Sequence, residues 1–420
     1  MDLKNKKVTV VGLGRSGLAA CRLLLKKGAM VSATDSSDTR ELRADTGKLK
    51  DTVDIEIGVH TEGKIEGRDL IVVSPGVSLD SAPISWARKK GIPVIAEIEL
   101  AFVFCPAPII AITGTNGKTT VTNLVGEIFK AAGRKCVVCG NVGRPFSAEV
   151  ENVTSEHTVA LEISSFQLET IEKFKPRLAV ILNLSADHLN RYSSFNEYVA
   201  AKCRIFLNQD EKDWALLNAE SHQDRLAQNT RAQVLYFSKD KYSGRQFRNF
   251  NSNHYAALSI SSLFDIPQEV AINTLRRFKG IEHRLEQVRE IAGVEFINDS
   301  KATNVDSTLW ALDSIKKPII LIAGGRDKGS DFATVREKIG ERLRAIVLLG
   351  EAKGKIEEAF RGSVKIKSTD TLSHAVREAF ALACSGDCVL LSPMCASFDM
   401  FTDYKQRGEV FKQVVHSLHA

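Results

Sequence analysis

Short hydrophobic runs alternate with amphipathic stretches along the chain. Runs such as Val8–Val11 and Ile109–Ile112 stand directly before glycine-rich turns, and the stretches that follow place apolar residues three or four positions apart. Short buried runs predict strands, and the longer spacing predicts helices. Strands and helices in repeated alternation are typical of a parallel sheet with helices on both faces. We therefore expect an α/β fold.

The alternation is interrupted twice. It pauses near Ala96–Ala101, and Gly280 ends a helical pattern. At roughly 150 residues per domain, a chain of 420 residues accommodates two or three domains. We expect three: a Rossmann-like domain over residues 1–97, a central P-loop domain with a parallel sheet over residues 98–279, and a second Rossmann-like domain over residues 280–420.

Composition and charge exclude several classes of protein. The chain has 57 Lys and Arg against 51 Asp and Glu, and the resulting surplus of +6 is shared by the first two blocks. The densest basic patch, around Arg245 and Arg248, is too small to favour a nucleic-acid surface. No apolar run approaches the about 20 residues of a membrane span, and the N-terminus lacks the pattern of a signal peptide. We expect a cytoplasmic protein, and no apolar stripe demands more than a monomer.

Cys136 and Cys139 have the spacing of a redox or zinc motif. Both fall on one predicted strand rather than at the start of a helix. Buried free thiols are therefore favoured over a redox or metal-binding pair, which stays as the alternative.

The first glycine-rich loop contains Gly12, Gly14 and Gly17, and Asp35 ends the next predicted strand. Such a loop lets backbone amides and a helix N-terminus bind a diphosphate, with the acid placed for a ribose hydroxyl. NAD(P), another nucleotide diphosphate and a purely structural turn are all compatible with this pattern. A diphosphate-bearing ligand other than NAD(P) is favoured.

The second glycine-rich loop is a shortened P-loop. It joins the run Ile109–Ile112 to a predicted helix, and Ile112 stands where the usual motif has its first glycine. Backbone amides would cradle phosphates, Lys118 would reach the β- and γ-phosphates, and Thr119 would hold Mg²⁺. The predicted ATP-binding residues of this loop are Gly114, Thr115, Asn116, Gly117, Lys118, Thr119 and Thr120.

The loop Thr113–Thr120 resembles that of the Mur ligases and the folylpolyglutamate synthases. Further segments resemble the Mur ligases in their order along nearly the whole chain: Leu161–Glu169, Asp187–Tyr192, Asn298–Asn304, Leu391–Phe401 and Gln406–Gly408. Within that family the segments most resemble the branch that joins D-glutamate to UDP-N-acetylmuramoyl-L-alanine in peptidoglycan synthesis, and this resemblance implies the same activity here. The resemblance implies ATP and two Mg²⁺ ions as cofactors.

The resemblance also implies catalytic residues. Glu162 ends a strand near the P-loop, where a carboxylate suits Mg²⁺, although a lone glutamate there would more often be solvated. By resemblance, His188 would ligate a second Mg²⁺ and Lys301 would support the transferring group. Lys202, which without the family would be taken for an exposed helix lysine, is implied to be carbamylated and to help hold the metal.

The remaining implied residues bind substrates. Asn253, Arg284 and Asp299 match residues that hold adenine, phosphate and ribose. The implied UDP-substrate residues are Gly14, Arg15, Ser16, Asp35, Ser36, Ser74, Asn141 and His188. The implied D-glutamate residues are Thr303, Lys328, Ser397 and Tyr404. The chain departs from the family in four places. Phe250 stands where an asparagine is common, and the stretch between residues 218 and 253 is shorter than usual. Tyr404 stands where phenylalanine is frequent, and Arg15 replaces a smaller apolar residue.

The expected reaction first forms an acyl phosphate from the substrate carboxylate and ATP, and ADP is released. The amine of D-glutamate then attacks the acyl phosphate to give a tetrahedral intermediate, which releases phosphate and becomes the amide. The last domain would close over the nucleotide.

Two alternative functions remain. An NAD(P)-dependent oxidoreductase would leave the P-loop and Glu162 unexplained. A nucleotide-sensing regulator is disfavoured by the presence of His188, Lys202 and Lys301.

Overall fold

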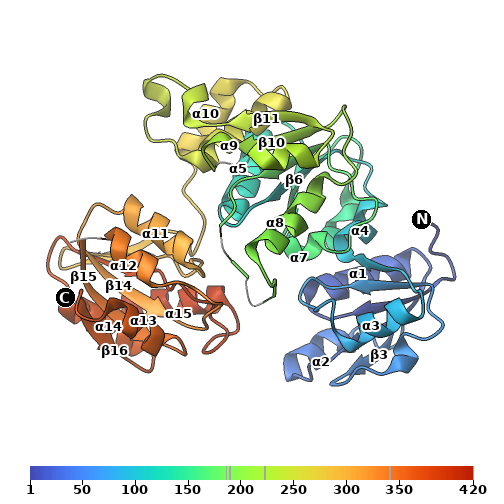
Figure 1. Cartoon of the computed structure of the whole chain (residues 1–420), viewed down its shortest axis with the longest axis horizontal. Helices are drawn as coiled ribbons and strands as arrows, with labels where there is room; N and C mark the ends of the chain where they lie inside the picture. Colours follow the sequence, from blue (N-terminus) through green and yellow to red (C-terminus); the bar gives the residue numbers. More distant parts are fainter. Residues whose placement is uncertain (186, 189–190, 222–223, 340–341, 420) are drawn as a thin grey trace. The chain divides into compact units, whose positions relative to one another are not determined.

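A computed structural model describes residues 1–185, 187–188, 191–221, 224–339 and 342–419. The fold contains three sheets (Figure 1). Contacts divide the chain into two compact units. The first unit contains Met1–Leu184 and Asn196–Phe278, and the second contains Ser185–Phe195 and Lys279–Ala420. The segment 187–192 that resembles the family includes residues 189 and 190, which lie outside the described part.

The first sheet is parallel, in the order β3-β2-β1-β4-β5. Its strands are β1 (Lys7–Val11), β2 (Met30–Asp35), β3 (Asp54–Ile57), β4 (Leu70–Val73) and β5 (Val94–Ala96). Its helices are α1 (Arg15–Lys26), α2 (Arg40–Gly47) and α3 (Ala82–Lys89). Val8 and Val10 pack into one buried cluster and Val11 into another, so both faces of the sheet are covered.

The second sheet is parallel in the order β11-β10-β9-β6-β8-β7. Its strands are β6 (Ile109–Thr113), β7 (Cys136–Gly140), β8 (Thr158–Glu162), β9 (Leu178–Ile181), β10 (Trp214–Asn218) and β11 (Gln233–Phe237). Its helices are α5 (Lys118–Ala131), α6 (Phe146–Glu149), α7 (Ser165–Leu168), α8 (Phe195–Cys203), α9 (Ser252–Leu263) and α10 (Gln268–Arg277). Ala111 and Ile112 enter opposite cores, as expected for a strand buried on both faces.

The third sheet has the order β12-β13-β17-β14-β15-β16, with β12 antiparallel at its edge. Its strands are β12 (Glu286–Ile291), β13 (Val294–Asn298), β14 (Ile319–Gly324), β15 (Leu343–Leu349), β16 (Lys365–Ser368) and β17 (Cys388–Leu391). Its helices are α11 (Val305–Ser314), α12 (Ala333–Ile339), α13 (Lys353–Phe360), α14 (Leu372–Leu382) and α15 (Tyr404–Ser417). The α/β class with three α/β domains is confirmed, and the expected domain boundaries stay predictions. The antiparallel edge strand was not predicted.

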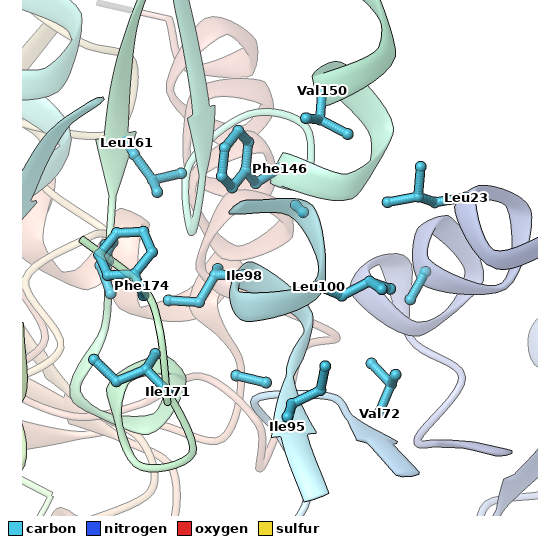
Figure 2. Packing of buried hydrophobic residues seen from close by; sticks show 14 of the residues in the cluster. Leu23, Val72, Ile95, Ile98, Leu100, Phe146, Val150, Leu161, Ile171 and Phe174 are labelled. Atoms are coloured by element: carbon cyan, nitrogen blue, oxygen red, sulfur yellow. The ribbon is translucent and has the colours of Figure 1, made fainter. Parts of the chain in front are cut away.

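A short helix, α4 (Glu97–Phe102), joins the first sheet to the second. Ile98 and Leu100 are fully buried and belong to a cluster that includes residues of both sheets (Figure 2). The Glu97 carboxylate accepts hydrogen bonds from the backbone N–H and hydroxyl of Ser147 at 2.7 and 2.5 Å. The Glu99 carboxylate accepts three backbone N–H groups from residues 172–174. Two buried carboxylates in the first turn of α4 therefore bind this connection to the central domain, in addition to its apolar packing.

Two further expectations from the sequence concern membrane-spanning segments and the pair Cys136 and Cys139. Among the helices in the described part, none has the length and apolar character needed to cross a membrane. Cys136 and Cys139 lie together on β7 as free thiols, and burial raises the pKa of Cys136 to about 12. A thiol held in its neutral form suits a structural role rather than a redox centre.

Candidate functional site

A cavity of about 530 Å³ opens at the carboxyl end of the first sheet and continues to the central domain, within the first unit. It is lined by seven of the residues implied to bind the UDP substrate: Gly14, Arg15, Ser16, Asp35, Ser36, Ser74 and Asn141. Polar lining residues that the sequence did not single out are Ser37, His60, Ser78, Ser81 and Gln167. Its volume and polar walls suit a nucleotide-sized ligand.

The glycine-rich loop at one end of the cavity is shaped by close backbone contacts. Gly12 has φ of +88°, and a Cβ on Gly17 would lie 1.8 Å from the Gly12 carbonyl oxygen. The Ser74 hydroxyl donates to that same oxygen at 2.7 Å. Helix α1 then begins beside Gly14, which has no side chain to cap it. The amide groups of this helix start are therefore available to an anionic ligand.

Asp35 has a structural role that the sequence pattern did not indicate. One of its carboxylate oxygens accepts the Leu13 N–H at 2.6 Å, and the other accepts the Ser37 N–H at 2.8 Å. The side chain thus ties the glycine-rich loop to the turn after β2. The expected bond to a ribose hydroxyl stays a prediction, and it would be made by a carboxylate already held in place from both sides.

The P-loop connects β6 to α5 in the second sheet. Gly114 and Gly117 have φ of +149° and +83°, conformations that disfavour other residues. The Lys118 ammonium group folds back and donates to the carbonyl oxygens of Gly114 and Thr115, both at 2.7 Å. The loop therefore has the curled backbone and the inward cation of a phosphate site.

Glu162 ends β8, the strand beside β6, opposite Ile112 in the register. Its side chain is 2% exposed, and one carboxylate oxygen accepts the Asn141 side-chain N–H at 2.7 Å. The other oxygen is buried and has no hydrogen-bond partner in the described part of the chain. A buried carboxylate oxygen left in this state is costly unless a ligand or cation satisfies it. Mg²⁺ prefers such oxygen donors, so Glu162 fits a magnesium site, with Thr119 of the P-loop as the second ligand expected from the sequence.

Lys202 is buried rather than exposed. It is 1% accessible, and its ammonium group donates to the Gly114 carbonyl oxygen at 3.0 Å and to the Thr113 hydroxyl at 3.3 Å. The ammonium also lies 4.7 Å from the ring centre of Tyr198, whose hydroxyl is 3.1 Å from that of Thr115. Helix α8 thus brings both residues against the P-loop, a placement that the sequence alone left open.

Asn253 also lies against the P-loop. A Cβ on Gly117 would come within 2.3 Å of the Asn253 side-chain oxygen. At the start of the same helix, α9, the ring of Phe250 stacks on that of His254 with centres 4.9 Å apart. Phe250, which stands where the family commonly has asparagine, therefore forms an aromatic pair with His254, and this pair flanks Asn253, the residue implied to contact adenine.

In the second unit, the carboxyl ends of three adjacent strands carry the residues implied to bind D-glutamate and the transferring group. Lys301 and Thr303 follow β13, Ser397 follows β17, and Lys328 follows β14. In an open α/β sheet this edge is the usual place for a ligand. The Lys301 ammonium lies 5.4 Å from the centre of the Tyr404 ring.

A buried acid stands beside these residues. Asp299 is 4% exposed and accepts the Ser392 hydroxyl at 2.9 Å and the Leu285 N–H at 3.2 Å. Burial raises its pKa to about 7, although the charges of Arg284 and Arg407 oppose the shift. The Arg284 Nε is buried with no hydrogen-bond partner in the described ranges, so a ligand oxygen would satisfy it.

His188 belongs to the second unit with the segment Ser185–Phe195, and it is not among the cavity-lining residues. Its backbone φ is +57°, and its ring Nε2 lies 3.7 Å from the carboxylate of Asp187. Asp187 accepts the side-chain N–H of Asn304 at 3.1 Å and faces the Lys328 ammonium at 3.9 Å. This segment therefore packs on the same sheet edge as the implied amino-acid residues.

Three family profiles match the chain. They are the Mur ligase MurD-like N-terminal domain over residues 6–96, the Mur ligase middle domain over residues 112–276, and the Mur ligase glutamate ligase domain over residues 283–395.

Relatives named UDP-N-acetylmuramoylalanine–D-glutamate ligase match over the full length. The one from Koribacter versatilis is 42% identical over 448 aligned residues, covering 100% of this chain and 99% of the relative. The one from Caldicellulosiruptor bescii is 43% identical, covering 100% and 99%.

Solved structures share the fold. The UDP-N-acetylmuramate–alanine ligase of Thermotoga maritima has a TM-score of 0.62 at 18% identity, covering 98% of this chain and 100% of its own. The MurF ligase of the same organism, solved with ADP, has a TM-score of 0.60 at 16% identity, covering 99% and 96%.

Proposed function

This chain belongs to the Mur ligase family, and we propose that it joins D-glutamate to the carboxylate of UDP-N-acetylmuramoyl-L-alanine at the expense of ATP. The observation that carries the proposal is the hydrogen bond between Asn141 and Glu162. It links the cavity suited to the UDP substrate to the end of the central sheet where the P-loop would bind ATP. Since cells supply ATP internally, the proposed place of action is the cytoplasm.

The reaction proceeds in two steps. The substrate carboxylate attacks the γ-phosphorus of ATP, the bond to the β-phosphate oxygen breaks, and an acyl phosphate and ADP result. The amine of D-glutamate then attacks the acyl carbon, and the tetrahedral intermediate loses phosphate and a proton to leave the amide. Activation is required because a free carboxylate is a poor acyl donor.

The first unit would position the anionic partners of the first step. The P-loop amides and Lys118 bind the polyphosphate, and the remaining loop residues fix its orientation. Thr119 and Glu162 would hold one Mg²⁺, with help from a carbamylated Lys202, and His188 would ligate a second. Bound Mg²⁺ supplies neutralisation of phosphate charge. Asn253 would contact adenine.

Carbamylation of Lys202 would add CO₂ to its neutral amine, forming an N–C bond and releasing a proton. The support is electrostatic. Lys118 and Lys202 both reach the Gly114 carbonyl, and two cations at one acceptor repel each other. A carbamate at Lys202 turns that repulsion into attraction and offers oxygen donors beside the P-loop.

The second unit would supply the incoming amino acid. Arg284 and Asp299 would bind phosphate and ribose of the nucleotide, and Lys301 would stabilise the charge on the transferring group. Thr303, Lys328, Ser397 and Tyr404 would bind D-glutamate, because a cation and hydroxyl groups recognise carboxylates.

Phosphate release tests the proposal directly. The purified protein is given ATP, Mg²⁺ and UDP-N-acetylmuramoyl-L-alanine, with D-glutamate, L-glutamate, L-alanine or L-lysine in separate reactions. We expect release with D-glutamate alone. Activity only with another amino acid would overturn the substrate while sparing the ligase class, and no release in any reaction would overturn both.

A further inference from the structure

We propose that His60 recognises the base of the nucleotide substrate by accepting a hydrogen bond from N3–H of uracil. This proposal rests on the proposed function, which places a uridine diphosphate in the cavity. His60 is half-buried, lines the cavity and was not among the residues expected from the sequence.

The position of His60 in the sheet matches the nucleoside end of the ligand. A diphosphate at the start of α1 places the ribose at the end of β2 and the base beyond it, toward the next strand. That next strand is β3, and His60 follows it. Ser36 and Ser37 line the cavity at the end of β2. Asn141 and Gln167, which line the cavity from the central domain, are left for the reacting end of the substrate.

The hydrogen bonds behind His60 determine which ring nitrogen holds the proton. The fully buried hydroxyl of Thr34 lies 2.8 Å from His60 Nδ1, 3.1 Å from Glu56 Oε2 and 3.2 Å from the Val59 carbonyl oxygen. A hydroxyl has one proton to give, and a carboxylate is the strongest acceptor of the three. Thr34 therefore donates to Glu56 and accepts a hydrogen bond from Nδ1–H of His60.

Glu56 is held in its ionised form. Burial alone would raise its pKa, but hydrogen bonds from Thr61 and Thr34 and the charge of Lys64 together lower it. The Thr61 N–H and hydroxyl donate to its two oxygens at 2.9 and 2.7 Å. The acceptor that orients the Thr34 hydroxyl is thus itself fixed.

This relay leaves Nε2 of His60 with a lone pair. Nε2 makes no hydrogen bond to any described residue, and His60 lines the cavity. Uracil presents N3–H, a donor that complements this nitrogen. Cytosine has an unprotonated N3, which would place two lone pairs against each other. The arrangement therefore selects uracil over cytosine.

The test compares three ligands, UDP, CDP and N3-methyl-UDP, by calorimetric titration of the wild type, His60→Phe and His60→Gln. In the wild type we expect UDP to bind roughly 3- to 10-fold more tightly than either analogue, the range of one hydrogen bond. His60→Phe keeps a flat ring but loses the acceptor, so its UDP-to-CDP ratio should fall to about 1. His60→Gln can place an amide oxygen near the same point and should retain a preference.

Kinetics separate recognition from a merely structural role. His60→Phe should raise KM for the UDP substrate while leaving kcat unchanged, because the base is remote from the reacting carboxylate. Equal UDP-to-CDP ratios in the wild type and His60→Phe would overturn the role of His60 and leave the proposed function standing. A wild type that does not bind UDP would overturn both.

Discussion

Lys118 and Lys202 donate hydrogen bonds to one acceptor, the carbonyl oxygen of Gly114, at 2.7 and 3.0 Å. The two lysines come from different helices, α5 and α8. One carbonyl oxygen thus accepts from two ammonium groups, and two positive charges brought to one acceptor repel each other. The first prediction follows from this convergence.

Replacing Lys202 with alanine should reduce ligase activity by roughly 100-fold or more, the usual cost of losing a charged group that acts on the transition state. Because the proposed active form of Lys202 is a carbamate, added formate or acetate should restore part of the activity. Initial rates of phosphate release, with and without these acids, measure both effects.

Lys130 provides the matched control, since it is an exposed lysine on α5. Lys130→Ala should keep full activity and respond to neither acid. An inactive Lys202→Ala that formate and acetate leave unchanged would contradict the carbamate, and a fully active one would contradict any catalytic role.

Replacing Glu162 with glutamine should raise the Mg²⁺ concentration needed for half-maximal activity by at least roughly 10-fold, because the neutral amide is a poorer ligand for a hard cation. The measurement is the Mg²⁺ dependence of phosphate release at saturating ATP. The control is Glu127→Gln, at an exposed position on α5. Identical Mg²⁺ curves for wild type and Glu162→Gln would rule out Glu162 as a ligand.

Gly14 and Gly17 occupy the same loop but differ in the space around them. A Cβ on Gly17 would lie 1.8 Å from a backbone oxygen, whereas one on Gly14 would meet nothing within 4 Å. We expect Gly17→Ala to lower the free energy of unfolding by roughly 2–4 kcal/mol and Gly14→Ala by less than about 1 kcal/mol. Urea denaturation measures both. Equal losses would show that the loop relaxes around the added methyl group.

Asp299 should make stability depend on pH. Its pKa is raised from 3.8 to about 7 in the folded protein, so between these values the folded state binds more protons than the unfolded state. The contribution to stability is therefore fully present below about pH 4, declines progressively above it, and is lost once the pH has risen through about 7. The part lost between pH 5 and pH 8 amounts to about 2–3 kcal/mol.

The variant Asp299→Asn removes this titration. Its amide can donate to the Ser392 hydroxyl, which also contacts Thr308 at 3.0 Å. The wild type should therefore lose about 2–3 kcal/mol more than the variant on going from pH 5 to pH 8, measured by chemical denaturation at both pH values. Parallel pH profiles for the two proteins would contradict the raised pKa.

Strands buried on both faces could be predicted from the sequence, because their apolar runs are continuous and end at glycines. Val8–Val11 and Ile109–Ile112 fall within β1 and β6. Edge strands could not be predicted in the same way. In β16, Lys365 and Lys367 lie on a partly exposed strand, and its stability comes from pairing with β15 rather than from its own composition.

The position of Lys118 in the candidate site could be predicted, because the spacing of the glycine-rich motif alone places a lysine at the start of the helix after the loop. Lys202 was different, since the sequence of α8 does not show which loop its buried face contacts. His60 was missed because its signal is tertiary. Thr34 and Glu56 stand on separate strands, and only the register of β2 with β3 brings them together behind the ring.

The helix α4, with Ile98 and Leu100 buried between two sheets and Glu97 and Glu99 bonded to the central domain, has a consequence for folding. The first two domains share a core there, so neither can open without exposing apolar surface of the other. They should melt together as one cooperative block. A fragment cut at residue 97 would leave Leu23, Val72 and Ile95 without their cover, and the cavity of about 530 Å³, which draws walls from both domains, would be lost with it.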